Sequence, residues 1–144
     1  MNLTEHFMLE ELTFSSTAQR LGIDNTPSLE MVAILTKTAI ALEQVRALLN
    51  VPMHVDSGYR CEALNKAVGG VANSAHIEGY AVDFIAPDFG TPLEIARAIA
   101  ASSIQFDQCI CEGTWVHISF DPRMRRQTLT ATFGPNGATY SQGV

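Results

Sequence analysis

The segment 29–49 constrains the fold most, because it is the longest stretch of the chain with a regular hydrophobic pattern. Its apolar residues recur at the spacing of one broad helical face. Thr26 and Pro27 supply an N-cap and a first-turn proline, while Asn50 and Pro52 end the pattern. We therefore expect a long scaffold helix here. Its apolar positions are Met31, Val32, Ile34, Leu35, Ile40, Leu42, Val45, Leu48 and Leu49.

A second helix is indicated by Thr91, Pro92 and Glu94, which form a capping box with proline at the first helical position, and it runs to about Ala101. The pattern then predicts an α+β fold, with N-terminal helices packed on a small antiparallel sheet. The shorter predicted elements are strands at Met53–Ser57 and Ala81–Ala86, a helix at Glu62–Val68 that ends at Gly69-Gly70, and strands at Phe106–Cys111, Trp115–Phe120 and Gln127–Phe133. The connection Glu112-Gly113-Thr114 is read as a tight hairpin.

Length and composition restrict the class of protein. A chain of 144 residues that is 47% hydrophobic and 17% charged is typical of a globular protein, and we expect one domain over residues 1–144. A net charge of -6 disfavours nucleic acid as a partner, although Arg123, Arg125 and Arg126 form a small basic cluster. No run approaches the roughly 18–20 apolar residues of a membrane span, so we expect no membrane insertion.

The N-terminal residues and the cysteines indicate in which cellular compartment the protein is made and whether its thiols are free. The first residues show neither a basic region nor an apolar one of a secretory signal, so we expect synthesis in the cytoplasm without a signal peptide. Cys61, Cys109 and Cys111 are too few and odd in number for a disulfide scaffold, and free thiols are expected. Cys61 follows Arg60 and leaves open a cysteine–histidine nucleophilic site.

Three polar residues raise the question of a metal site. On a strand that contains Trp115 and Ser119, His117 lies on the face opposite the apolar one. Asp83 lies inside an apolar strand, where an ionised carboxylate needs a compensating cation. With His76, these residues make a two-imidazole, one-carboxylate set suited to a catalytic zinc. The alternative is that Asp83 pairs with Arg60 and that both histidines are surface polar groups.

Three motifs in order resemble those of the zinc D-Ala-D-Ala carboxypeptidase superfamily, peptidase family M15, whose fold is shared with hedgehog signalling domains. Residues 74–83, SAHIEGYAVD, match the SxHxxGxAxD pattern at every defined position. Residues 57–60, SGYR, resemble the substrate-binding segment, and residues 115–117, WVH, resemble the second metal motif. The motif-bearing core is 51–133. Gly79 and Ala81 are read as room for close packing around the metal.

The resemblance implies one Zn²⁺ per chain, held by His76, Asp83 and His117. It implies that Glu112 is the catalytic base and that Arg60 contacts the substrate or the developing oxyanion. In a regular strand, a separation of five residues would send Glu112 and His117 to opposite faces, and Gly113 at the hairpin is expected to re-aim the carboxylate. Further residues placed near the substrate or the metal by the resemblance are Tyr59, Ser74 and Asp56.

The function that the resemblance implies is a zinc metallopeptidase acting on peptidoglycan stem peptides, and we expect a monomer. The bond is either the terminal D-Ala-D-Ala link or the L-Ala-D-Glu link. The N-terminal segment is similar to that of stand-alone domains from bacteriophages and prophages, in which the enzyme reaches the cell wall through a holin or within the virion. The alternative is a non-catalytic, zinc-stabilised module that binds the cell wall or another partner.

Overall fold

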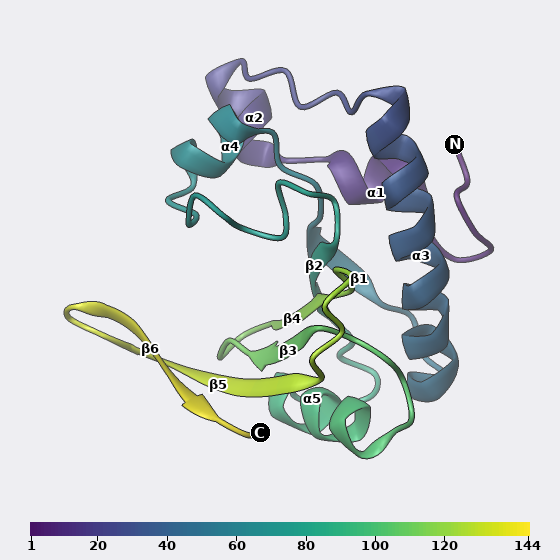
Figure 1. The fold of residues 1–144 in the computed structure, drawn as a ribbon, viewed down its shortest axis with the longest axis vertical. Coiled ribbons are helices and arrows are strands. Elements are labelled where there is room, and N and C mark those ends of the chain that lie inside the picture. Colours follow the sequence, from purple (N-terminus) through teal and green to yellow (C-terminus); the bar gives the residue numbers. More distant parts are fainter.

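The computed structural model describes all residues, 1–144, and has the expected α+β class (Figure 1). Helices dominate the first half of the chain and strands the second. The helices are α1 (Leu9–Thr13), α2 (Ser16–Leu21), α3 (Leu29–Leu49), α4 (Glu62–Ala67) and α5 (Pro92–Ala101). None of them is both long enough and apolar enough to cross a membrane.

Six strands form one sheet in the order β1-β2-β4-β3-β5-β6. All neighbouring pairs are antiparallel except β3 and β5, which run parallel. The sheet is therefore antiparallel as expected, except at the pair of β3 and β5. The reason is that the segment 120–126 crosses the end of the sheet and brings β5 in beside the start of β3. The strands are β1 (His54–Ser57), β2 (Ala81–Ile85), β3 (Gln108–Cys111), β4 (Val116–Ser119), β5 (Gln127–Gly134) and β6 (Gly137–Gln142).

The main hydrophobic core lies between one face of the sheet and the helices α3 and α5. Residues of β2 and β4 alternate between this core and the other face, as the two-residue period of a strand requires. Val82, Phe84, Val116 and Ile118 are fully buried in the core. The helical contribution comes mainly from Leu35, Ala39, Leu42, Val45, Leu49, Ile95, Ala96 and Ile99.

Local signals predicted some boundaries and missed others. The capping box of Thr91 and Glu94 is present as expected, and α5 ends at Ala101. The predicted cap of α3 is wrong, because the Ser28 hydroxyl accepts the amide hydrogen of Met31, while Thr26 donates its own amide hydrogen to Asp24. The short helices α1 and α2 and the strand β6 were not predicted.

Candidate metal centre

The second face of the sheet is a cleft, and the register of the strands decides which side chains line it. Asp83 on β2 lies opposite His117 on β4, which lies opposite Ile110 on β3. Residues directly opposite one another on adjacent strands share a face. The same register that buries Val82 and Phe84 therefore turns Asp83 and His117 toward the cleft, which has a volume of about 800 Å³.

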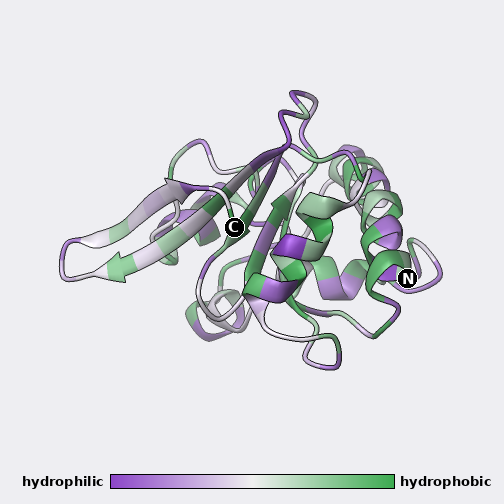
Figure 2. Cartoon of the chain, turned by 90° about the horizontal axis from the view of Figure 1, so that it is seen from below, coloured by the Kyte–Doolittle hydropathy of each residue, from purple (hydrophilic) through white to green (hydrophobic).

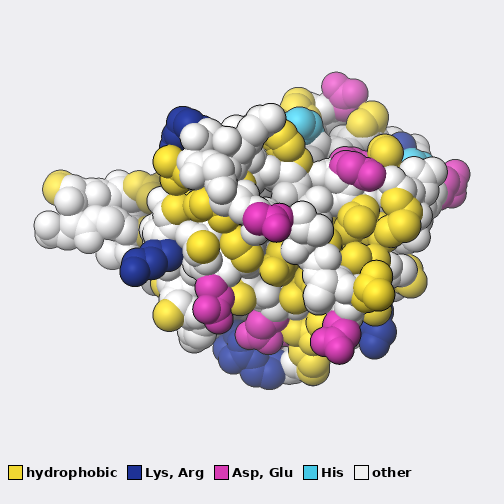
Figure 3. All heavy atoms as spheres, turned by 90° about the horizontal axis from the view of Figure 1, so that it is seen from above, with side chains coloured by type: hydrophobic (Ala, Val, Ile, Leu, Met, Phe, Trp, Pro, Cys, Tyr) yellow, Lys and Arg dark blue, Asp and Glu magenta, His cyan; other side chains and the backbone are white.

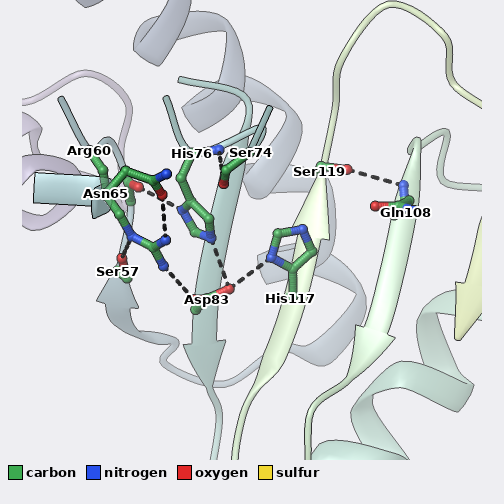
Figure 4. A network of polar contacts seen from close by, with 10 residues as sticks. Ser57, Arg60, Asn65, Ser74, His76, Asp83, Gln108, His117 and Ser119 are labelled. Carbon is green, nitrogen blue, oxygen red and sulfur yellow. Dashed lines mark hydrogen bonds and ion pairs between the residues drawn. The ribbon is translucent and has the colours of Figure 1, made fainter. Parts of the chain in front are cut away.

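His76 joins these two residues from the loop between α4 and β2 (Figure 4). Ligand atoms of His76, Asp83 and His117 all lie within 4.8 Å of one another. Asp83 Oδ1 is 3.2 Å from His76 Nε2 and 2.9 Å from His117 Nδ1. The side chains are 3%, 11% and 11% exposed for His76, Asp83 and His117. The three residues that the sequence singled out are thus brought together, and neither histidine is a surface group.

The tautomer of His76 is set by a backbone carbonyl. His76 Nδ1 is 2.7 Å from the oxygen of Gly58, which can only accept, so Nδ1 carries the hydrogen. Burial lowers the pKa of His76 and favours the neutral ring, whose Nε2 then presents a lone pair to Asp83. Burial acts to raise the pKa of Asp83, and the hydrogen bond with His117 is the largest effect that lowers it. Two buried acceptors face each other, and a cation between them would satisfy both.

These three residues fit a zinc ion. Tetrahedral zinc with bonds of about 2.0–2.2 Å to nitrogen and oxygen separates its donors by roughly 3.3–3.5 Å. The separations of 2.9 and 3.2 Å between the carboxylate oxygen and the two imidazole nitrogens are close to that value. Three protein donors leave a fourth position for water or substrate, as in catalytic zinc sites. The Gly58 carbonyl behind His76 provides the outer-shell partner that metal-ligating histidines usually have.

Arg60 lies on the other side of the Asp83 carboxylate. Its Nη2 is 3.5 Å from Asp83 Oδ2, while the histidines contact Oδ1. Arg60 also donates to Ser57 Oγ and to Asn65 Oδ1, which hold the guanidinium at the cleft wall (Figure 4). The carboxylate is therefore divided between an arginine and the metal cluster. The supporting role of Asn65 was missed, because an amide inside a short helix carries no sequence signal.

Glu112 shares the cleft with the three candidate ligands. The pairing of Cys111 with Val116 places Glu112 opposite Trp115, and the Glu112 amide donates to the Trp115 carbonyl at 2.9 Å. Trp115 is two residues from His117, so Glu112 and His117 lie on the same face. The parity rule for a single regular strand does not apply here, because Glu112 and His117 belong to two paired strands joined by the hairpin. Gly113 closes the turn with a φ of +80°, which favours glycine.

The electrostatic setting of Glu112 suits a base that is shielded from water. Burial raises the pKa of Glu112 above its ordinary value of 4.5, the His117 side chain opposes this, and the Asp83 charge adds to it. A carboxylate with a raised pKa beside a metal site is a stronger proton acceptor than one in water. Glu112 therefore lines the same cleft as the candidate ligands and has a raised pKa.

The remaining predicted contacts lie at different distances from the cleft. Ser74 lines it, and its hydroxyl accepts the amide hydrogen of His76. Tyr59 instead packs against the main core, and Asp56 pairs with His54 at 3.5 Å. Cys61 caps α4 through a contact of its sulfur with the Leu64 amide. The residues lining the cleft include neither Tyr59, Asp56 nor Cys61.

The expectation that Gly79 makes room around the metal is wrong. Gly79 has a φ of +78°, and a Cβ there would collide with Met31 and Ile34 of α3. Its carbonyl accepts a hydrogen bond from Thr38 Oγ1 at 2.7 Å. The glycine therefore allows the metal loop to pack against the long helix, and the small side chain at Ala81 is buried in the sheet.

Comparison with known proteins agrees with this geometry. The sequence model of the Peptidase M15 family matches residues 5–119, a segment that holds His76, Asp83, Glu112 and His117. No curated protein matches the sequence. Since the match covers well over half of the chain, the protein belongs to the Peptidase M15 family.

Proposed function

We propose that this protein is a zinc-dependent peptidase that hydrolyses peptide bonds in the stem peptides of peptidoglycan. The observation that carries the proposal is the pair of buried acceptors, His76 Nε2 and Asp83 Oδ1, which face each other 3.2 Å apart beside His117 and on the same cleft as Glu112. A cation would satisfy both acceptors of such a cluster, and a carboxylate on the same cleft supports a reaction in which a proton is moved. Membership of the Peptidase M15 family supports the same reaction class.

In the proposed reaction, the metal ion and the side chains of the cleft would have different roles. His76, Asp83 and His117 would hold the zinc ion, which when bound would polarise the scissile carbonyl and lower the pKa of water from about 15.7 to roughly 7. Glu112 takes the proton from the attacking water and delivers it to the departing amine as the carbon–nitrogen bond breaks. Arg60, held by Ser57 and Asn65, keeps N–H donors free for a substrate carboxylate or carbonyl oxygen. Ser74 borders the same space.

The choice of substrate rests on the resemblance of the motifs to the D-Ala-D-Ala carboxypeptidases. Stem peptides contain free carboxylates that suit the planar donors of Arg60. The bond would be either the terminal D-Ala-D-Ala link or the L-Ala-D-Glu link. A phage-encoded enzyme of this kind would act on the bacterial cell wall after release through a holin or as part of a virion, as a monomer with one zinc ion.

Incubation with purified sacculi and with defined stem peptides tests this function. Zinc-loaded protein and its Glu112→Gln variant would be compared, with products identified by mass spectrometry. We expect the wild type to release one type of fragment, which identifies the bond, and the variant to release almost none. If the wild type cleaves no stem peptide, the peptidase proposal fails. Retained cleavage by the variant would remove only the role of Glu112.

The identity of the metal is tested by removal and replacement. Two imidazoles and a carboxylate favour zinc over magnesium, which prefers oxygen ligands and retains water. We expect a chelator to abolish peptide cleavage and zinc to restore it best among divalent ions. Restoration by magnesium alone would contradict the proposed ligand set.

The second candidate function is a zinc-stabilised binding module without catalysis. It is favoured by one observation, the ion pair between Arg60 and Asp83, which draws the arginine toward the ligand set and could serve structure alone. For this module we expect binding to sacculi that depends on zinc and leaves the sacculi intact. A soluble fragment released by the wild type would reject it.

A further inference from the structure

The cleft continues beyond the metal cluster onto the hairpin formed by β5 and β6, which lies outside the segment matched by the family. Ile110 on β3 is paired with Leu129 on β5, and Ala131 on β5 is paired with Tyr140 on β6. Alternate residues of β5 share a face, so Phe133 lies on the cleft face as well. Both Phe133 and Tyr140 line the same cleft as His117 and Glu112.

The floor of this extension is apolar and separate from the main core. Ile110, Leu129 and Ala131 form a small cluster of their own, with exposures of 6%, 8% and 7%. Phe133 and Tyr140 stand beside it, and they are 56% and 55% exposed. Figure 2 shows the hairpin projecting from the body of the molecule with alternating hydrophobic and polar bands. This end of the cleft therefore offers apolar surface that no part of the chain covers.

Charge separates the two ends of the cleft. Residues 127–142 contain no Asp, Glu, Lys or Arg, and the projecting hairpin is correspondingly free of charged side chains on the face seen in Figure 3. The opposite end is lined by two aspartates and two arginines, paired with each other, Asp107, Asp121, Arg123 and Arg125. Glu112 lines the same cleft as the hairpin, and its carboxylate would repel an anionic side chain of the substrate. The hairpin end of the cleft therefore favours an uncharged side chain.

The hairpin is paired with β3 and packs against Trp115, the residue just before β4, the strand that carries His117. The ring of Phe133 lies 6.4 Å from that of Trp115, which is opposite Glu112 and two residues before His117. Burial raises the pKa of the Tyr140 phenol, and the charges of Glu112 and Asp83 add to the increase, as expected for a ring that shares their cleft. The extension is therefore continuous with the place where the scissile bond would lie.

We propose that Phe133 and Tyr140, above the floor of Ile110, Leu129 and Ala131, form a subsite that takes an apolar side chain of the residue next to the scissile amide. The inference rests on the proposed peptidase function and adds to it a preference for an apolar side chain in the substrate. The residues that select the substrate side chain then lie mainly on the β5–β6 hairpin and not in the metal-binding motifs. In an apolar pocket, one methylene group of the substrate is worth about 10–200-fold in selectivity.

Peptides that carry Gly, Leu or Asp at either position flanking the cleaved bond test the subsite with the zinc-loaded, full-length protein. We expect kcat/KM to favour Leu over Asp at one of the two positions by at least about 10-fold. A Phe133→Ser, Tyr140→Ser double variant brings this ratio close to one. Because the ratio is taken within one preparation, it does not depend on the folded fraction. Thr139→Ala, on the opposite face of β6, is the matched control and keeps the wild-type ratio.

A binding measurement separates the subsite from the proposed function. Trp115 is the sole tryptophan of the chain and contacts Phe133, so its fluorescence reports on peptide in the subsite. In zinc-loaded Glu112→Gln protein, we expect the Leu peptide to bind at least about 10-fold more tightly than the Asp peptide. Leu-selective binding without any cleavage by the wild type would retain the subsite and reject the peptidase. Cleavage and binding that are equal for Leu and Asp, or a ratio unchanged in the double variant, would overturn the subsite.

Discussion

The two faces of the sheet are made from the same strands, yet they differ in almost every physical property. On β2, Val82 and Phe84 are sealed against the helices, whereas Asp83 between them faces the cleft. On β4, Val116 and Ile118 lie in the core, and His117 lies opposite Asp83. The packing of the core face against the helices fixes the register of β2 and β4. This register then places Asp83 opposite His117 on the cleft face. Substitutions on each face should therefore have separable effects.

The largest effect is expected from Asp83→Ala on the cleft face. Even the loss of a partner behind a metal ligand costs roughly 10–100-fold in affinity, so removal of a ligand should weaken zinc binding by more than about 100-fold and abolish peptide cleavage. Zinc affinity by calorimetry and cleavage by mass spectrometry measure both. Asp56→Asn is the matched control, because this carboxylate lies on neighbouring β1 and outside the cleft lining. Wild-type zinc affinity in Asp83→Ala would remove Asp83 from the ligand set.

Glu112→Gln should separate proton transfer from metal binding on the same face. The amide keeps the size of the side chain but cannot accept a proton, and general-base catalysis typically contributes about 10²–10⁴-fold. We expect kcat to fall by that factor while zinc affinity and the thermal midpoint stay near wild type. A decrease in zinc affinity equal to that of Asp83→Ala would instead make Glu112 a metal ligand.

Phe84→Ala tests the covered face. Removal of a fully buried aromatic ring leaves a cavity and typically costs about 3–5 kcal/mol in the free energy of unfolding. Chemical denaturation should show this loss, while the zinc affinity of the protein that remains folded changes little. If Phe84→Ala weakened zinc binding as strongly as Asp83→Ala, the two faces would not be separable.

Gly58→Ala should weaken zinc binding by a smaller factor than Asp83→Ala. The substitution creates a clash with α1, outside the cleft, and thereby disturbs a contact of the ligand His76. A Cβ at this position would collide with the carbonyl of Leu12 in α1 and displace the Gly58 oxygen that accepts from His76 Nδ1. We expect zinc affinity to fall by roughly 10–100-fold, as measured by competition with a chelator. Gly22→Ala, which has open space at the Cβ but a φ of +68°, controls for the backbone cost of replacing a glycine. Equal zinc affinity in both variants would show that the carbonyl contact is dispensable.

The smallest expected effect is a shift in the titration of Glu112. Burial raises its pKa, so in the metal-free protein the carboxyl group should lose its proton above pH 4.5, and a nearby zinc ion should lower that midpoint by favouring the charged form. Carboxyl carbon NMR follows the titration, and Glu112→Gln assigns the signal. A midpoint at or below 4.5 without metal would mean that Glu112 is solvated outside the cleft.

Much of this arrangement could be predicted from local patterns. The class of fold and the helices α3 and α5 followed from periodicity and capping residues, whereas the joint position of His76, Asp83 and His117 followed from the resemblance of the motifs to those of a known family. The parallel pairing of β3 and β5 could not be predicted, because it depends on the path of residues 120–126 rather than on any strand's own composition. The shared face of Glu112 and His117 required the pairing across the hairpin. The same holds for Tyr140, whose strand has no buried residue to signal it.

The most direct measurement is a crystal structure of the zinc-loaded protein with anomalous scattering recorded on both sides of the zinc absorption edge. We expect one strong peak per chain, bonded at about 2.0–2.2 Å to His76 Nε2, an oxygen of Asp83 and His117 Nδ1, with Glu112 facing the open position. A peak elsewhere, or none at this cluster while Asp83 remains paired with Arg60 alone, would contradict a metal centre on the cleft face.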